Sequence, residues 1–421
     1  MTQTLKTALI LSIALALVLS AAGPGQSAVE IQKFQMADNL YRLQCPGAKD
    51  FTVSLMVLKG ENGLLVIDAG YFNTQEEVAE LIGSIGNGKV TTLVYTHYHG
   101  DHLGSSKLIG GEATIIAHEN TARRLDMQYG FMGEESVVAL PTSTLGDSLI
   151  IDFEGQKVRL LHFPRAHTDG DVVVHFVDAN VVFLGDLVFG GMLPFIHGSR
   201  GGTVTGLRKC FEAMLEMFPD DVTFVPAHGQ PHTKAQLVHY DEQLMKMVGI
   251  VEAEIEGGKS ADEIIAADAL GEWRAWSKPD YNTDTVLIAS IYENKIYAGN
   301  PPKPISEVLL PMVMEKGVEA ALDFYREVKS TQADKYDFGE GELNALGYNL
   351  MWRKMLDEAE VVFKLNIEVF PESGNAYDSM GELYVTKGDK AAAIKNYEKS
   401  LELAPDNANA VEVLKTLKET P

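Results

Sequence analysis

Short hydrophobic runs, separated by turn sequences and amphipathic stretches, fill the chain from about residue 39 to residue 233. The β-rich runs 51–58 and 64–67 flank Glu61-Asn62-Gly63, which predicts a β-hairpin. Hairpins mixed with strand–helix alternation predict two mixed sheets packed together, with helices over their outer faces. Further strands are expected at 93–96, 114–117, 149–153, 157–163, 171–177, 181–184 and 222–225, and helices at 73–85, 103–109, 204–218 and 235–256.

The last part of the chain repeats with a period of 34 residues. The recurring pairs are Gly347 and Gly381, Ala359 and Ala393, Phe363 and Tyr397, and Pro371 and Pro405. Small residues at helix crossings, an aromatic on the second helix and a final proline are typical of a helix–turn–helix unit. Residues 340–407 therefore resemble tetratricopeptide repeats, with a capping helix at 409–419 and a degenerate first pair at 306–329.

The first 28 residues have the order of a secretory signal peptide. Lys6 precedes an apolar run, Ala8–Leu19, and small residues follow at 20–22. The run is shorter than the roughly twenty apolar residues that span a bilayer. We therefore expect cleavage after Ala22 and a periplasmic or secreted protein with no stable membrane anchor. An uncleaved anchor is the alternative.

Composition limits the classes of partner and of fold. The chain has 35 basic and 59 acidic residues, a formal charge of −24, which argues against nucleic-acid binding. Hydrophobic residues at 46% and charged residues at 22% are ordinary values for globular proteins. The two cysteines, Cys45 and Cys210, cannot staple a chain this long, and we expect two buried free thiols.

The stretch 96–102, Thr-His-Tyr-His-Gly-Asp-His, carries the clearest chemistry. His97 and His99 are two positions apart just past a predicted strand, so both imidazoles can point the same way. Asp101 and His102 follow in the turn before the next helix, where they can face a second centre. Imidazole and carboxylate ligands suit zinc, and iron or manganese are alternatives.

With this motif, the chain from about Phe51 to His228 resembles the metallo-β-lactamase superfamily of metal-dependent hydrolases, whose signature is H-x-H-x-D-H. Three further positions match the family pattern: His167 in a loop between hairpin strands, Asp186 in Leu-Gly-Asp, and His228 in Pro-Ala-His-Gly. The resemblance implies an αββα sandwich. The expected fold class is α+β, with this sandwich followed by an α-helical tetratricopeptide-like domain.

The resemblance also implies two zinc ions per chain. The first would bind His97, His99 and His167, the second would bind Asp101, His102 and His228, and Asp186 would bind both. Two such cations hold a hydroxide between them and polarise the substrate. Asp101 and Asp186 are the expected catalytic residues, with Asp101 orienting the nucleophile or relaying a proton. Asp68 belongs to the same pattern and is expected to brace the site by hydrogen bonding.

Other polar residues are expected to have less direct roles. Asp169 and Asp171 follow His167 closely and suit a turn or a supporting position. A single histidine is more often a surface residue than a metal ligand. We therefore expect His118, His162 and His175 to be surface residues.

The region around Asp186 and His228 offers candidates for substrate binding. The glycine-rich segment 189–202 predicts a mobile flap over the metals. His197 or His232 could help to bind substrate, and Arg200 or Lys234 could anchor a substrate carboxylate.

These observations divide the chain into four segments. Residues 1–28 are the signal peptide and leader, 29–256 the metallo-β-lactamase-fold catalytic domain, 257–330 a helical extension and connecting region, and 331–421 the tetratricopeptide-like repeats.

The predicted function is that of an exported dinuclear zinc hydrolase. It would use a metal-bridging hydroxide to cleave an ester, thioester, lactone or amide bond of a small molecule. β-Lactamases of this family usually have cysteine or serine at the position of Asp186. The aspartate therefore makes β-lactam hydrolysis an alternative and not the main prediction. Two further alternatives are a mononuclear iron oxygenase and a scaffold whose repeats bind a protein partner while the metal domain is secondary.

Overall fold

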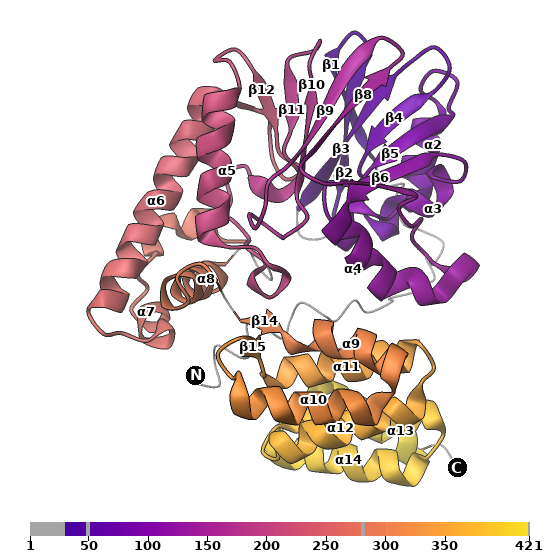
Figure 1. Ribbon diagram of the computed structural model, residues 1–421, viewed down its shortest axis with the longest axis vertical. Helices are drawn as coiled ribbons and strands as arrows, with labels where there is room; N and C mark the ends of the chain where they lie inside the picture. The colour runs from indigo at the N-terminus through magenta and orange to yellow at the C-terminus, as the bar shows by residue number, and fades with distance from the viewer. Residues whose placement is uncertain (1–29, 48–50, 279–282, 301, 420–421) are drawn as a thin grey trace. The chain divides into compact units, whose positions relative to one another are not determined.

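The computed structural model describes residues 30–47, 51–278, 283–300 and 302–419 (Figure 1). The predicted signal peptide, with its cleavage site after Ala22, lies outside these residues. The chain divides between residues 301 and 302 into two compact units. Within the described ranges, no helix is both long and apolar enough for a membrane span.

The first sheet of the N-terminal unit contains seven strands in sequence order. Strands β1 to β4 form an antiparallel meander, and β4 to β7 run parallel to one another. The predicted hairpin around Glu61-Asn62-Gly63 is confirmed as the β3–β4 connection. The strands are β1 (Gln32–Ala37), β2 (Leu40–Pro46), β3 (Thr52–Lys59), β4 (Leu64–Ile67), β5 (Val90–Val94), β6 (Thr114–His118) and β7 (Ser143–Leu145).

The second sheet has six strands in the order β13-β12-β11-β10-β9-β8. Both predicted hairpins are present, as β8 with β9 and β10 with β11. Strand β12 then joins β11 in parallel. The strands are β8 (Ser148–Phe153), β9 (Gln156–His162), β10 (Val172–Phe176), β11 (Val181–Phe183), β12 (Thr223–Val225) and β13 (His232–Thr233).

Helices cover the outer faces of both sheets, and the predicted αββα sandwich is confirmed (Figure 1). Side chains from the two sheets, such as Leu55, Val66 and Phe183, share one core, and a second core lies between the second sheet and its helices. The helices on the first sheet are α2 (Gln75–Gly83), α3 (Ser106–Ile109) and α4 (Glu119–Tyr129), and those on the second are α5 (Val204–Met217) and α6 (Lys234–Glu256).

The predicted connecting region 257–330 is not one segment. Helices α7 (Ala261–Ala266) and α8 (Asp284–Ile296) belong to the N-terminal unit, because Ile264 and Leu287 are fully buried in the core around α5 and α6. Residues from 302 onward belong to the C-terminal unit. The compact unit that contains the predicted catalytic domain therefore continues to residue 301, past the predicted boundary at 256.

The C-terminal unit consists of helical pairs and a two-stranded parallel ladder of β14 (Lys303–Pro304) and β15 (Tyr336–Asp337). Gly347 faces the ring of Phe363, and 34 residues later Gly381 faces the ring of Tyr397, so the repeat is a repeated packing contact. The helices are α9 (Ile305–Lys316), α10 (Val318–Thr331), α11 (Glu340–Trp352), α12 (Leu356–Val369), α13 (Gly374–Lys387), α14 (Lys390–Leu403) and α15 (Ala408–Glu419).

Both cysteines are buried and unpaired, as the sequence predicts. Cys45 lies on β2 and Cys210 on α5, and burial raises the pKa of each thiol. A buried thiol with a raised pKa is a poor nucleophile, so neither cysteine is a candidate for chemistry.

Candidate metal centre

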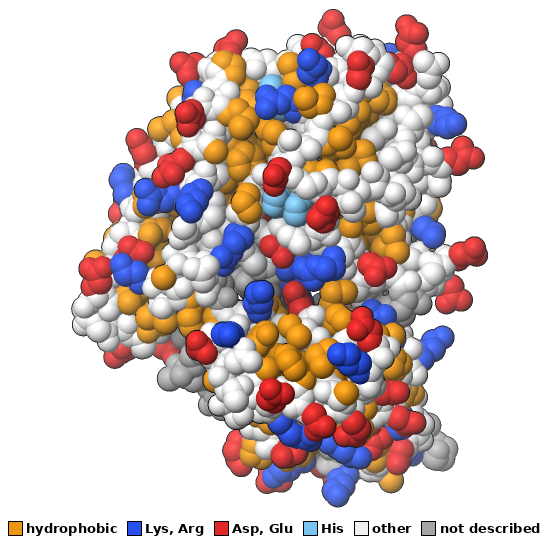
Figure 2. Space-filling view, viewed as in Figure 1, with side chains coloured by type: hydrophobic (Ala, Val, Ile, Leu, Met, Phe, Trp, Pro, Cys, Tyr) orange, Lys and Arg blue, Asp and Glu red, His pale blue; other side chains and the backbone are white. Residues whose placement is uncertain are grey.

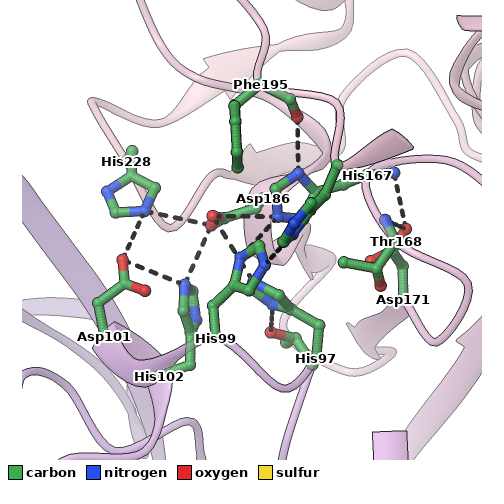
Figure 3. A network of polar contacts seen from close by, with 12 residues as sticks. His97, His99, Asp101, His102, His167, Thr168, Asp171, Asp186, Phe195 and His228 are labelled. Atoms are coloured by element: carbon green, nitrogen blue, oxygen red, sulfur yellow. Dashed lines mark hydrogen bonds and ion pairs between the residues drawn. The ribbon is translucent and has the colours of Figure 1, made fainter. Parts of the chain in front are cut away.

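The seven predicted ligands meet at one edge of the two sheets, and each follows a strand (Figure 3). Parallel strands bring their carboxyl ends to the same edge, which is why residues far apart in sequence converge there. His97, His99, Asp101 and His102 follow β5, His167 lies between β9 and β10, Asp186 follows β11, and His228 follows β12.

The first group of ligand atoms contains three imidazoles and one carboxylate oxygen. His97, His99, His167 and Asp186 have ligand atoms that all lie within 4.8 Å of one another. His99 Nδ1 is 3.1 Å from His167 Nε2, and Asp186 Oδ2 is 3.6 Å from that same nitrogen. His97 Nε2 lies 3.7 Å from Asp186 Oδ2.

The second group uses the other oxygen of the same aspartate. Asp186 Oδ1 lies 3.2 Å from His102 Nε2 and 3.3 Å from His228 Nε2. Asp101 Oδ2 completes the group, 3.2 Å from His228 Nε2. Asp186 is therefore common to both groups, with one oxygen facing each.

Backbone carbonyls hold two of the imidazoles from behind. His167 Nδ1 donates to the carbonyl of Phe195, and His228 Nδ1 donates to that of Thr52, each over 2.6 Å. A carbonyl oxygen can only accept, so the proton of each neutral ring is on Nδ1 and the lone pair of Nε2 faces the site.

Asp68 braces both groups, as expected from the sequence. Its Oδ2 accepts hydrogen bonds from His102 Nδ1 over 2.7 Å and from Thr96 Oγ1 over 2.8 Å, and its Oδ1 accepts from Thr96 N. The Thr96 hydroxyl, 3.1 Å from His97 Nδ1, can then accept from that ring. One buried carboxylate thus orients an imidazole in each group.

The polar atoms at the centre fit bound cations. Three buried atoms, His97 Nε2, His102 Nε2 and Asp186 Oδ1, form no hydrogen bond, and each such group costs about 1–3 kcal/mol. The lone pair of His167 Nε2 also points at His99 Nδ1 only 3.1 Å away. One cation in each group would satisfy these atoms, and imidazole with carboxylate is a donor set for zinc and similar divalent metals.

Burial and charge act differently on the two groups. In the first, burial lowers the pKa of His97 and His167, and it lowers the pKa of His99 to about 3, so these rings stay neutral. In the second, burial opposes the charge on His102 and His228, but nearby carboxylates raise the pKa of His102 well above its ordinary value and that of His228 to about 9.

The two carboxylates of the centre stay ionised. Burial alone would raise their pKa values, but the surrounding histidines hold the pKa of Asp186 well below its usual range and lower that of Asp101 to about 2. The ionised carboxylates and the neutral imidazoles of the first group are in the forms that bind metal, and a cation in the second group would displace the protons of His102 and His228.

The loop that carries His167 is fixed by the two aspartates that follow it. Asp171 accepts hydrogen bonds from the backbone N–H groups of His167 and Thr168, each over 2.8 Å. Asp169 forms an ion pair with Arg124 of α4, over 2.8 and 2.7 Å. Both aspartates therefore have the supporting roles expected from the sequence.

The surface assignment is wrong for His118 and His175, while His162 is half-buried, and none of the three belongs to the two groups of candidate ligands. His118 is buried and stacks on His162 with ring centroids 3.6 Å apart, and His175 is buried against Phe218. The three residues lie on β6, β9 and β10, which are interior strands of covered sheets, so their side chains are packed even where the sequence pattern is polar.

The segment 189–202 is anchored, which contradicts its predicted role as a mobile flap. Leu193 and Ile196 are buried in the core, and Leu193 N donates to the Trp276 carbonyl over 3.0 Å. His197 N donates to the His167 carbonyl over 2.9 Å. Apolar residues between the glycines make this segment a fixed wall beside the imidazoles.

The candidate substrate-binding residues are placed differently from one another. Lys234 binds the Phe218 carbonyl over 2.8 Å and Asp220 over 3.0 Å, so its ammonium is already engaged. His232 binds the Gln230 carbonyl. Arg200 lies close enough to His197 to lower the pKa of that ring, after the larger effects of burial and of His99. His197 contacts two predicted ligands, His99 through its ring over 2.8 Å and the His167 carbonyl through its backbone N–H over 2.9 Å.

Several residues that shape the centre carry no recognisable sequence signal. Thr52 and Phe195 act through their carbonyls, which every residue type has. Arg124 lies 43 positions before His167 in the sequence, and the residues around it form no motif that indicates a role at the centre. Tyr98 lies inside the histidine motif, and its position alone could have indicated it.

Two family models match parts of the chain. The metallo-beta-lactamase superfamily model matches residues 48–229, and a tetratricopeptide repeat model matches residues 374–407. The first match includes all seven predicted ligands, and the second includes α13 and α14.

Known proteins are similar over part of the chain. A linear primary-alkylsulfatase from Pseudomonas sp. (strain ATCC 19151) is 26% identical over 239 residues, covering 45% of this chain and 43% of its own length. The chain thus spans less than half of that relative. A type 2 metallo-beta-lactamase from Bacteroides fragilis is 22% identical, covering 51% and 86%. A hydroxyacylglutathione hydrolase from Prochlorococcus marinus (strain MIT 9211) is 29% identical, covering 34% and 56%.

Among solved structures, the metallo-beta-lactamase from Pontibacter korlensis superposes with a TM-score of 0.45 and 18% identity. It covers 51% of this chain and 98% of its own.

Proposed function

Because residues 48–229 form a domain of the metallo-beta-lactamase superfamily, we propose that this protein is a dinuclear zinc hydrolase. Its proposed reaction is the cleavage of an ester, thioester, lactone or amide bond in a small molecule. The tetratricopeptide repeat at 374–407 is proposed to bind a protein partner.

The observation that carries the proposal is the position of Asp186. Its two oxygens face two separate groups of imidazoles, at 3.6–3.7 Å on one side and 3.2–3.3 Å on the other. A carboxylate in this position can hold two cations at once, and paired cations suit the stabilisation of attacking and leaving oxygens.

Cations held by these residues would supply Lewis acidity, which acidifies water and polarises a substrate carbonyl. The protein supplies orientation. Asp101 is the more exposed of the two carboxylates, 24% against 4% for the Asp186 side chain, so it can meet a molecule that enters from solvent. Nearby histidines lower the pKa of Asp101, so its carboxyl is ionised, which is the form that binds a cation.

Zinc is proposed because the donors are imidazole and carboxylate and because hydrolysis needs no change of oxidation state. The same donors bind iron, as the oxygenase alternative requires. Metal analysis of protein from unsupplemented growth distinguishes them, since two zinc ions per chain support the hydrolase and a single iron contradicts it.

The substrate class is narrowed by charge. Acidic and basic side chains are interspersed on the face shown in Figure 2, and the chain carries a net charge of −24, which favours a small substrate over nucleic acid. The relatives are named for alkyl sulfates, β-lactams and hydroxyacylglutathione, so each bond type belongs in the assay.

The test is turnover of a panel by zinc-loaded protein. The panel contains acyl lactones, glutathione thioesters, β-lactams, alkyl sulfates and phosphodiesters. We expect turnover of a carbonyl substrate, abolished by Asp186→Asn and retained by Asp221→Asn, an exposed control. Turnover of phosphodiesters alone would contradict the proposal.

Export to the periplasm or medium is proposed from the leader sequence. Cell fractionation with amino-terminal sequencing tests it, and we expect a mature chain beginning at residue 23. Full-length protein in the cytoplasm would contradict export while leaving the proposed chemistry intact.

A further inference from the structure

His99 differs from the other four imidazoles in what lies behind it. The other four rings contact a carbonyl, a carboxylate or a hydroxyl through Nδ1. His99 is turned the other way: its Nδ1 faces His167, and its Nε2 lies 2.8 Å from Nδ1 of another imidazole, that of His197. The Tyr98 hydroxyl is close to both, 3.2 Å from His99 Nε2 and 2.9 Å from His197 Nδ1.

The tautomer of His99 decides whether the first group can hold a cation. A neutral imidazole has one N–H and one lone pair, and only the lone pair binds metal. His99 Nδ1 is the atom that faces the group, so the proton must be on Nε2. Whatever contacts Nε2 must then accept a hydrogen bond.

His197 Nδ1 is placed to be that acceptor. If His197 carried its proton on Nε2, its Nδ1 lone pair would accept from His99 Nε2–H over 2.8 Å. If His197 carried its proton on Nδ1, it would donate to His99 Nε2, force the His99 proton onto Nδ1 and disable the ligand. The hydrogen bond between the two rings therefore couples their tautomers.

The backbone holds His197 firmly in this position. Its N–H donates to the His167 carbonyl over 2.9 Å, and its own carbonyl accepts from Arg200 N over 2.9 Å and Gly202 N over 3.1 Å. The preceding residue, Ile196, is buried in the core. The acceptor thus sits on the anchored segment 189–202 and is tied to the loop of another ligand, His167.

The Tyr98 ring, whose hydroxyl contacts His99 and His197, is also held in place. The Arg124 guanidinium lies 5.5 Å from the centroid of the Tyr98 ring and is itself held by Asp169. A cation over an aromatic face attracts the ring and limits its movement. Helix α4, which contributes no predicted ligand, thereby reaches the centre through this pair.

We propose that His197 is a positioning residue for the first metal site: it accepts the proton of His99 Nε2 and so fixes the tautomer that turns the Nδ1 lone pair to the cation. This inference rests on the proposed function, because it assigns a role within that metal centre. Tyr98 Oη is the secondary acceptor at the same nitrogen. His197 does not contact the reacting atoms in this role, which differs from the substrate-binding role considered from the sequence.

The test compares variants at one position. His197→Asn keeps an acceptor oxygen near the place of Nδ1, whereas His197→Leu removes it. Because Tyr98 could substitute as acceptor, the His197→Leu/Tyr98→Phe double variant removes both. His239→Leu, at an exposed position on α6, is the matched control.

Two readouts do not depend on turnover. Long-range ¹H–¹⁵N correlation spectra of zinc-loaded protein report which His99 nitrogen carries the proton. Titration with Zn²⁺ against a chromophoric chelator reports the affinity of each site. We expect Nε2–H on His99 in the wild type and in His197→Asn, and loss of that single tautomer in the double variant. The Zn²⁺ affinity of the first site should fall roughly 10–100-fold in the double variant. It should stay close to the wild-type affinity in His197→Asn.

The possible failures can be told apart. If wild-type protein binds no pair of Zn²⁺ ions, the proposed function fails. If it binds two, and the double variant keeps the His99 tautomer and both affinities while remaining folded, the role of His197 is refuted. Equal losses at both sites, or the same loss in His239→Leu, would show a general structural effect and also refute it.

Discussion

Asp186 presents its two oxygens to different groups of imidazoles, and each imidazole is held by a second partner behind it. The ligands themselves are predictable from the sequence, because the H-x-H-x-D-H motif and three further positions follow strand ends. The residues that hold these ligands from behind are harder to predict from the sequence. Asp68 is marked by the family pattern, but the carbonyls of Thr52 and Phe195 have no residue-type signal, and His197 is one of several nearby histidines.

Asp68→Asn tests the bracing at the scale of a single residue. Asp68 accepts hydrogen bonds at both oxygens, from His102 Nδ1 and from Thr96 N, whereas asparagine has a single acceptor oxygen, so the substitution cannot preserve both contacts. We expect the affinity of the second site to fall roughly 10–100-fold. The measurement is calorimetric titration with Zn²⁺, with Asp221→Asn as control. An unchanged affinity at both sites would contradict the bracing role.

Elements with a clear hydrophobic period are predictable, and those with polar buried residues are not. Helices α5 and α6 and the repeat helices follow their sequence patterns closely. Helix α4 has no predicted counterpart because it buries Thr121 and Arg124 along with Leu125, so its inner face lacks an apolar stripe. Short helices such as α7 bury few residues, so their sequence does not show which core they join.

Gly347→Ala tests the repeat packing. A Cβ at residue 347 would lie 2.3 Å from the Phe363 ring, whereas at Gly341 of the same helix it would meet nothing within 4 Å. We expect Gly347→Ala to lower the free energy of unfolding of the C-terminal unit by about 1–3 kcal/mol. Gly341→Ala should raise it by up to about 1 kcal/mol. Urea unfolding followed by circular dichroism measures both, and equal effects would refute the packing argument.

Glu360 predicts a pH dependence for the same unit. Hydrogen bonds from Lys364 and Lys387 lower the pKa of its carboxyl to about 2, from an ordinary value of 4.5. A lowered pKa in the folded state stabilises the fold above pH 4.5, and this stabilisation is lost as the pH falls from 4.5 towards 2.

Thermal unfolding between pH 7 and pH 2.5 measures this effect. Glu360→Gln should be less stable than wild type at pH 7 and should lose less stability on acidification. Glu372→Gln, an exposed control, should follow the wild-type curve. Parallel curves for Glu360→Gln and wild type would contradict the assignment.

At the scale of the whole molecule, a metal-binding sandwich and a helical repeat unit share one chain. The sandwich follows from alternating strands and hairpins, and its sheet edge gathers the ligands because β5, β11 and β12 end there. The division at 301/302 coincides with the proline-rich sequence Pro301-Pro302-Lys303-Pro304, which predicts a break, whereas no local signal shows which core the helices before it join.

The central claim is that two cations share Asp186, and anomalous diffraction from crystals of the zinc-loaded protein tests it most directly. We predict two zinc peaks, one among His97, His99 and His167 and one among Asp101, His102 and His228, each in contact with one Asp186 oxygen. A single peak, or peaks that do not contact Asp186, would contradict the claim.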